Sequence, residues 1–299
     1  MKKKVTVTIG IPAYNEEANI GYLIDSILNQ ERTSYVIESI VVLNDGSTDK
    51  TKNMVLNLAQ KNAEISCLDD GNRLGKIERL NQVFKMNKSN ILILFDADLM
   101  LSSTNVIESM ISKFEKGVAL VCPDKYPLQS KTFIEKLINY LYDLFYQIRI
   151  DLHGGDNLHN FTTCAFGITE EFAKKLYYPK NIYPITKFTY LAAIKNGLKF
   201  KLAKEVRVYY RSPNNLKDYC LQVNRFSNVL ALNKLYYGIW IDNVAHIPLL
   251  LKVKVFLRMF LSNPFLFILA IMLRIYVRFK RKGTSGSIWE LAVSSKKLI

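Results

Sequence analysis

Residues 1–125 alternate short apolar runs with segments in which apolar residues recur every three or four positions. The apolar runs have the length of strands and occupy residues 5–11, 39–43, 65–68, 91–95 and 118–122. The segments between them have the spacing of amphipathic helices, for example at Ile20, Leu23, Ile24 and Ile27. Strands that alternate with helices predict an α/β fold with a mostly parallel sheet and helices on both of its faces.

Polar turns follow the predicted strands, at residues 12–17, 44–49, 71–76 and 96–98. In a parallel sheet the ligand binds beyond the carboxyl ends of the strands, so these turns predict where the site lies. Asp96 and Asp98 would hold a divalent cation that bridges two phosphates, although a solvated turn has the same composition. Asp45 would accept a hydrogen bond from a nucleotide base, or belong to a turn in which Gly46 takes a positive φ. The 71–76 turn offers cations to a phosphate but lacks full P-loop spacing.

Together, the four turns resemble the donor-site motifs of family 2 glycosyltransferases with the GT-A fold, in order and in spacing. The resemblance resumes at residues 222–226, which are similar to the family's QxxRW element with Phe in place of Trp. It implies a Rossmann-like sheet, a nucleotide-diphosphate sugar of the UDP or GDP type as donor, and Mg²⁺ or Mn²⁺ as cofactor. The chemistry agrees with this, because a metal ion stabilises the departing diphosphate.

The same resemblance implies roles for single residues. Asp98 would ligate the metal, and Gln222 and Arg225 would lie near the diphosphate and the acceptor. The residues expected to bind the donor are Pro12, Ala13, Tyr14, Glu16, Asp45, Lys76 and Asp96.

The chain departs from the family on the acceptor side. Inverting members carry a Glu-Asp pair whose Asp deprotonates the acceptor hydroxyl, whereas Lys187 and Phe188 occupy those positions here. No general base can therefore be assigned. Three explanations are open. The acceptor is an already ionised phosphate, such as a polyprenyl phosphate; a displaced carboxylate serves, with Asp156, Glu170 and Glu171 as candidates; or transfer activity has been lost.

The segment 247–299 combines apolar sequence with positive charge. It holds ten Lys and Arg residues and one Glu, in a chain whose net charge is +15. Such a segment suits an anionic membrane surface better than nucleic acid. Residues 255–277 are long enough to span a bilayer, but Pro264 would equally split them into two helices lying in the interface, and a buried core helix is the third possibility. The aromatic face of a helix at 131–151 would pack on the sheet or lie at the membrane.

The sequence thus predicts three parts. Residues 1–125 form the nucleotide-sugar-binding half of a GT-A domain, residues 126–246 its acceptor-binding half, and residues 247–299 helices associated with the membrane. The expected function is metal-dependent transfer of a sugar to a lipid-linked or glycan acceptor at the cytoplasmic face of the cell membrane. The alternative is a catalytically silent relative that binds or scaffolds within a glycan-assembly complex. A sugar nucleotidyltransferase is disfavoured, because its N-terminal Gly-rich loop is missing.

Overall fold

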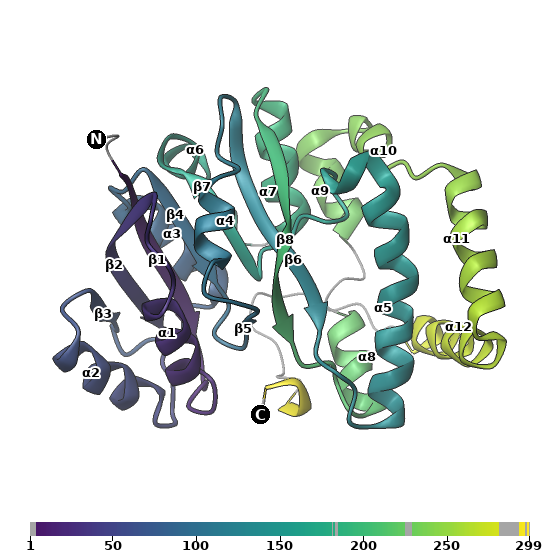
Figure 1. The fold of residues 1–299 in the computed structure, drawn as a ribbon, viewed down its shortest axis with the longest axis horizontal. Helices are drawn as coiled ribbons and strands as arrows, with labels where there is room; N and C mark the ends of the chain where they lie inside the picture. Colours follow the sequence, from purple (N-terminus) through teal and green to yellow (C-terminus); the bar gives the residue numbers. More distant parts are fainter. Residues whose placement is uncertain are drawn as a thin grey trace.

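An eight-stranded sheet with the order β3-β2-β1-β4-β7-β6-β8-β5 runs through the described part of the chain (Figure 1). The computed structural model describes residues 4–180, 182, 185–224, 229–280, 293–296 and 298. The strands are β1 (Val5–Ala13), β2 (Tyr35–Asn44), β3 (Ile65–Leu68), β4 (Ile91–Phe95), β5 (Met100–Leu101), β6 (Val118–Pro127), β7 (Ala165–Thr169) and β8 (Lys199–Tyr210).

The sheet is mostly parallel, as the alternating pattern predicts. Strands β3, β2, β1 and β4 are parallel neighbours, and β6 and β8 are parallel to each other. Strand β7 lies between these two blocks and is antiparallel to both β4 and β6. Two successive antiparallel pairings restore the original direction, so the carboxyl ends of both blocks lie at the same edge of the sheet.

Helices cover both faces of the sheet. On one face α1 (Ile20–Leu28), α2 (Thr51–Lys61) and α4 (Val106–Ile111) contribute to a first core. On the other face α3 (Lys76–Met86), α6 (Glu170–Lys175) and α7 (Ile185–Lys195) contribute to a second. Alternate residues of β4 enter the two cores, Ile91 and Ile93 the first and Leu92 and Leu94 the second. A strand buried on both faces has no residue that faces water, and β4 is therefore an unbroken apolar run.

The long helix α5 (Phe133–Asp151) begins at a capping box, in which the Thr132 hydroxyl accepts from the Glu135 amide and the Glu135 carboxylate accepts from the Thr132 amide. Its apolar residues pack against α12 (Pro264–Phe279) and α11 (Leu249–Ser262). These apolar residues thus pack on two other helices, while Tyr142 and Tyr146 of the same helix contact Tyr126 on β6 of the sheet. The remaining helices are α8 (Leu216–Asn224), α9 (Val229–Tyr237), α10 (Trp240–Val244) and the 3-10 turns η1 (Leu152–Gly155) and η2 (Val293–Ser295).

The apolar run at 255–277 is split between α11 and α12, as one of the predicted arrangements requires. Asn263 ends α11, and its side chain accepts from the Leu266 amide to cap α12, which opens with Pro264. In the described ranges, no helix has both the length and the apolar character needed to cross a bilayer. Residues 255–277 therefore form parts of two helices and not the single spanning helix that was one of the expectations. Both helices nevertheless expose large apolar side chains, among them Leu249, Leu250, Leu261, Phe265 and Phe279.

Candidate active site

The turns that follow β1 and β2 are bonded to each other at the carboxyl edge of the sheet. Pro12 and Ala13 end β1 beside β2, and the Ala13 carbonyl accepts from the Asp45 amide at 2.8 Å. Asn15 takes a left-handed φ of 52°, donates its amide to the Ser47 hydroxyl at 3.1 Å and accepts from the Thr48 amide at 2.8 Å. These contacts fix the two turns as one unit, so the predicted donor-site residues lie together.

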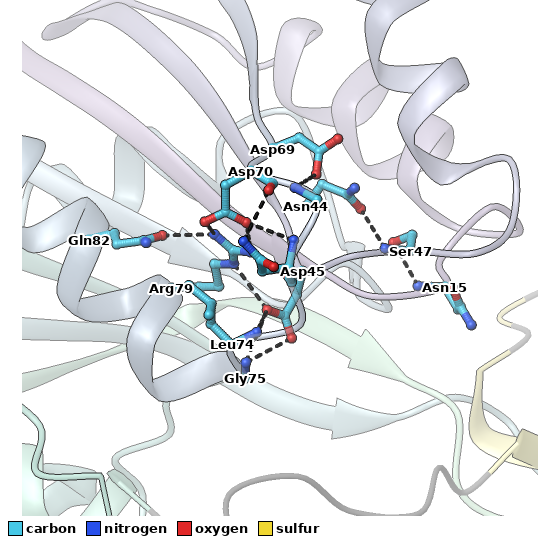
Figure 2. Close-up of polar contacts among 12 residues, drawn as sticks. Asn15, Asn44, Asp45, Ser47, Asp69, Asp70, Leu74, Gly75, Arg79 and Gln82 are labelled. Atoms are coloured by element: carbon cyan, nitrogen blue, oxygen red, sulfur yellow. Dashed lines mark hydrogen bonds and ion pairs between the residues drawn. The ribbon is translucent and has the colours of Figure 1, made fainter.

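Asp45 is buried and holds the following loop in place (Figure 2). Its carboxylate accepts from the backbone amides of Leu74 at 2.8 Å and Gly75 at 3.0 Å, and from Nε of Arg79 at 3.0 Å. Gly46 takes the positive φ, 69°, that the turn alternative requires. Asp45 therefore fixes the loop before α3, while its contact with a nucleotide base stays a prediction.

The Arg79 guanidinium is fully buried and joins two acidic turns (Figure 2). Besides Asp45 it contacts the Asp70 carboxylate at 2.8 Å and the Asn72 carbonyl at 2.6 Å. The bond from Arg79 lowers the pKa of Asp70 to about 2. Above this loop the Arg73 guanidinium lies 3.8 Å from the centre of the Tyr14 ring. Arg73 is one of the two cations that the 71–76 turn is expected to offer to a phosphate, whereas no sequence pattern indicates Arg79, because its carboxylate partners come from two different turns.

Asp96 and Asp98 follow β4 at the same edge. Lys76, the first residue of α3, donates to the Asp96 carboxylate at 2.5 Å and to the Thr163 carbonyl at 3.4 Å. Burial and the neighbouring Asp96 charge raise the pKa of Asp98 to about 6. Two carboxylates that disfavour each other's charge form a fitting site for a divalent cation, which would relieve the repulsion.

In the described residues no cluster of three or more His, Cys, Asp or Glu side chains forms a metal cage. A cation held by Asp96 and Asp98 would therefore take its other ligands from the donor phosphates and water, as magnesium-type sites commonly do.

Lys125 of β6 brings a further cation to this edge, which no sequence pattern indicates. Its ammonium lies 3.2 Å from the Cys164 sulfur and 4.3 Å from the centre of the Tyr210 ring. Burial opposes the charge of Lys125, but Cys164, Tyr210 and Asp96 outweigh it and raise the Lys125 pKa. The Asp96 amide in turn donates to the Cys164 carbonyl at 2.7 Å. Lys125 is thus placed between the acidic turn and the acceptor side.

A tyrosine wall, Tyr126, Tyr142, Tyr146 and Tyr210, continues from Lys125 along β6, α5 and β8. The Tyr142 and Tyr146 rings stack at 5.9 Å, and Tyr126 meets both edge-on. Arg149 lies 4.8 Å from the Tyr142 ring centre, and its Nε has no hydrogen-bond partner in the described part of the chain. The wall therefore presents flat aromatic surfaces next to a cation.

The start of α7 contains Lys187 and Phe188, the two residues predicted to stand at the positions of the family's acidic pair. Phe188 is buried against the rings of Tyr178, Tyr236 and Tyr237, at centroid distances of 6.0, 5.4 and 5.5 Å. Burial lowers the pKa of Lys187. The contact of α7 with the donor side runs through Thr186, whose hydroxyl lies 2.9 Å from that of Thr163.

The three displaced carboxylates are engaged elsewhere. Asp156 pairs with Lys201 at 2.9 Å and accepts from the Leu202 amide at 2.8 Å. Glu170 and Glu171 begin α6 and pair with Lys174 and Lys175 four residues on.

The direction of β7 places α6 far from the acidic turn. Thr169, the last residue of β7, is paired with Ile91 at the amino end of β4, whereas Asp96 follows its carboxyl end. Glu170 and Glu171 therefore lie at the edge of the sheet opposite to Asp96 and Asp98.

Gln222 lies on α8, while Arg225 falls outside the described residues. Glu16 is buried in the turn between β1 and α1. The Asn19 side chain donates to its carboxylate at 3.0 Å, and Lys296 forms an ion pair with it. The site therefore includes a residue from the far end of the sequence, close to the predicted donor pocket.

Comparison with known proteins identifies related sequences. The family described as Glycosyl transferase family 2 matches residues 8–177. A glycosyltransferase of Synechocystis, named as uncharacterized, is 26% identical over 144 residues, which are 48% of this chain and 44% of that protein. The 4,4'-diaponeurosporenoate glycosyltransferase of Staphylococcus aureus is 32% identical over 121 residues, 39% of this chain and 31% of the relative. The chain thus matches less than half the length of these curated relatives.

Solved structures share the fold. A mannosyltransferase from Pyrobaculum calidifontis, in complex with GDP-Man and Mn²⁺, superposes with a TM-score of 0.65 over 94% of this chain and 77% of its own, at 17% identity. The glucosyl-3-phosphoglycerate synthase of Mycobacterium tuberculosis, in complex with Mn²⁺, UDP and phosphoglyceric acid, gives 0.54 over 79% of each chain, also at 17% identity. The architecture is that of the GT-A glycosyltransferases, and with the family match over residues 8–177 the chain belongs to glycosyltransferase family 2.

Proposed function

We propose that this protein transfers a sugar from a UDP- or GDP-linked donor, with a divalent metal, to a lipid-linked acceptor whose attacking oxygen is already ionised. The donor half of the proposal rests on the cluster of turns around Asp45, Lys76 and Asp96, which lies at the carboxyl edge of the parallel strands, where such sheets bind ligands. The structural neighbours were solved with GDP-Man or UDP and with Mn²⁺, which supports the same class of donor and metal.

Asp98, with Asp96 beside it, would hold the metal, and Mg²⁺ and Mn²⁺ both suit such oxygen ligands. When bound, the ion supplies positive charge that stabilises the departing nucleoside diphosphate. Lys76 pairs with Asp96 and so holds that carboxylate in place at the first turn of α3. The protein's own part is to orient the donor and exclude water from it.

The single observation that carries the acceptor proposal is the lack of a carboxylate at the start of α7. Lys187 and Phe188 stand there, and Glu170 and Glu171 lie at the wrong edge of the sheet. An ionised phosphate or carboxylate needs no base, because its oxygen is already a nucleophile near neutral pH. The staphylococcal relative is named for an acid anion, 4,4'-diaponeurosporenoate, which supports an anionic acceptor.

The acceptor side offers positive charge to such a group. Lys125 lies at the acidic edge, and Arg149 stands over the tyrosine wall with an unpartnered Nε in the described residues. Both cations lie close enough to Tyr210 to act on its ionisation. An anionic headgroup would be held by these cations while its apolar chain runs along aromatic rings.

The proposed location is the cytoplasmic face of the cell membrane. Helices α11 and α12 expose apolar side chains such as Leu250 and Phe279, and carry Lys252, Lys254 and Arg278 among them. Apolar side chains inserted between anionic headgroups, with lysine and arginine beside them, are typical of helices lying in a membrane interface.

The experiment is transfer by the parent chain and by Lys187→Glu, with polyprenyl phosphate and with glycan acceptors, across UDP- and GDP-linked sugars. For a phosphate acceptor, Lys187→Glu should lower transfer by about tenfold or more, because it repels the anionic acceptor. A second variant, Thr186→Asp, tests the opposite hypothesis, that the acceptor is a hydroxyl that needs a base. If glycan hydroxyls were the natural acceptors, Thr186→Asp would raise transfer by up to ~10²–10⁴, the contribution of a general base.

The Phe188→Asp change is unsuited to this test. The sequence alone suggests it as a restored base, but Phe188 is 8% exposed and surrounded by aromatic rings. A carboxylate buried there would disrupt the packing of α7, so a change in the transfer rate would not show whether the carboxylate acts as a base.

A second candidate, a silent binding or scaffold subunit, is favoured by the same missing base. Acceptor-dependent release of nucleoside diphosphate by the parent chain excludes it. Nucleotide binding with no release, across the whole donor and acceptor panel, would support it instead.

A further inference from the structure

The residues 293–296 and 298, here named the strap, cross the carboxyl edge of the sheet near the predicted donor pocket. Figure 1 shows this segment beside the C label, between α1 and α8 and far from α11 and α12. It is the last described part of the chain, yet it contacts residues near the first strand. The separation in sequence between Lys296 and its partner Glu16 is 280 residues.

On the donor side the strap is bonded to the turn that follows β1. The Lys296 ammonium pairs with the Glu16 carboxylate, and the Lys296 carbonyl accepts from the Asn19 side chain. The Asn19 side-chain oxygen accepts from the Leu298 amide at 3.4 Å. Glu16 and Asn19 are 4% and 2% exposed, so these bonds lie within the fold and are not surface encounters.

On the acceptor side the strap is bonded to the segment between β8 and α8. Asp218 accepts from the Ser294 amide at 2.8 Å, and the Asn214 amide donates to the Ser294 hydroxyl at 3.3 Å. Arg211 donates to the Leu298 carbonyl at 2.8 Å, and the Leu298 side chain is 4% exposed. Asp218 lies on α8, the helix that also carries Gln222.

We infer that the strap is part of the donor site, with Lys296 as a positioning residue that holds Glu16 and the β1 turn in the geometry that binds the nucleotide. The inference rests on the proposed function, because it takes that turn to bind a nucleotide. Glu16 lies two residues after Tyr14, and Asn19 stands at the start of α1. The strap therefore contacts both ends of the turn between β1 and α1. By contacting α8 as well, it fixes the distance between the donor turn and the Gln222 helix.

The charge of Lys296 is suited to this role. Its side chain is 24% exposed and that of Glu16 is 4% exposed. Burial lowers the pKa of Lys296 to about 8, so its ammonium is still the main form at neutral pH. Removing it leaves a buried carboxylate whose remaining polar partner is Asn19, at 3.0 Å in the described structure. Without its partner, the Glu16 carboxylate reorients toward water and displaces the loop that follows β1.

The test measures the Kd of UDP and of GDP, each with Mn²⁺, by calorimetry on the full chain. Lys296→Met should weaken binding of the preferred nucleotide by about tenfold, the usual effect of losing one charge-assisted bond. Lys296→Arg should recover most of it. In turnover the loss should appear in the donor KM more than in kcat, since the residue positions the donor and does not touch the reacting atoms.

The matched control is Lys175→Met, which removes a lysine from the exposed pair with Glu171 on α6 and should leave the Kd unchanged. A charge exchange guards against misfolding: Glu16→Lys alone should bind poorly, and adding Lys296→Glu should restore part of the affinity. Melting curves of every variant check that the fold is retained.

The outcomes separate this inference from the proposed function. If the parent binds UDP or GDP and a chain ending at residue 292 binds it equally well, the strap has no part in the donor site. Tighter binding by the shortened chain would make the strap an obstruction and overturn the inference as well. If the parent binds neither nucleotide, the proposed donor class is wrong, and the inference fails with it.

Discussion

Asp98 and Arg79 show two different uses of buried charge within one site. Asp98 stands beside Asp96 with a pKa raised to about 6, so its charge is poorly compensated by the protein alone. Arg79 is fully buried, yet it has carboxylate partners in both Asp45 and Asp70. The first arrangement leaves a place for a ligand, whereas the second closes a structural network.

The Asp98→Asn change is expected to abolish divalent-dependent donor binding. The amide keeps the shape of the side chain but removes the charge, and Asp96, the other carboxylate after β4, is paired with Lys76 and leaves too little negative charge for the ion. Calorimetry of UDP and GDP with and without Mn²⁺ measures the effect. Donor affinity in the parent that does not change on adding EDTA would contradict the metal proposal, and Asp242→Asn on α10 serves as the control.

The Arg79→Met change is expected to destabilise the fold by about 3–5 kcal/mol, because it strands the buried Asp45 carboxylate. Arg32→Met removes an arginine from a half-exposed pair with Glu64, and should cost about 1 kcal/mol or less. Urea unfolding of both variants gives the two free energies. Equal losses in the two variants would show that Asp45 does not depend on Arg79.

The contribution of the Arg79–Asp70 pair should also depend on pH in a defined direction. The pKa of Asp70 is lowered to about 2 in the fold, below its value in an unfolded chain. The pair therefore adds stability above pH ~4, and this is lost as the pH falls from ~4 toward ~2. The difference in free energy of unfolding between parent and Asp70→Asn should shrink over that range and stay constant above it.

At the scale of elements, the sequence predicted best where a strand is buried on both faces. The five apolar runs coincide with β1, β2, β3, β4 and β6; β4 is buried along its whole length, as a continuous apolar run predicts, whereas the edge strand β3 is fully buried only at Ile65. Strand β8 was missed since charged residues such as Lys201 and Glu205 interrupt it, and β5 is only two residues long. Lys125 and the strap were missed for another reason, as their partners are distant in sequence and only the fold brings them together.

Helices α11 and α12 should bind anionic vesicles through their exposed apolar side chains. Leu250 and Leu261 are 80% and 77% exposed, so replacing both by Asp should cost little in folding. It should lower vesicle binding by about tenfold or more, since each inserted leucine contributes about 1.5–3 kcal/mol. Leu56→Asp, on α2 at the other side of the molecule in Figure 1, is the control.

Flotation with vesicles of anionic and of neutral lipid measures the electrostatic and the apolar contributions to binding. High salt alone should weaken binding without eliminating it, because only the basic component is screened. A parent chain that stays unbound in low salt would contradict the membrane location.

At the scale of the whole molecule, the predicted donor and acceptor halves share one sheet. Strand β7 from the second half is hydrogen-bonded between β4 and β6, and β4 and nearly all of β6 belong to the first half. The two cores lie on opposite faces of that sheet and each draws residues from both halves. The halves should therefore unfold as one cooperative unit.

Hydrogen exchange followed by mass spectrometry tests this cooperativity. Peptides covering β4 and β7 should be among the slowest to exchange and should share the same dependence on denaturant. Exchange of β7 at much lower denaturant than β4 would mean that the two halves separate before global unfolding.

The position of β7 also bears on how the reaction cycle turns over. Because β7 of the second half is hydrogen-bonded between two strands of the first half, the described part of the sheet has no hinge at which the halves could move apart. For the proposed transfer, donor binding and release of the nucleoside diphosphate would then be gated by short segments laid over this rigid edge, through small and correspondingly fast displacements. In such a framework, changes to those segments tune how fast product leaves, while the framework itself keeps the reacting groups in register from one cycle to the next.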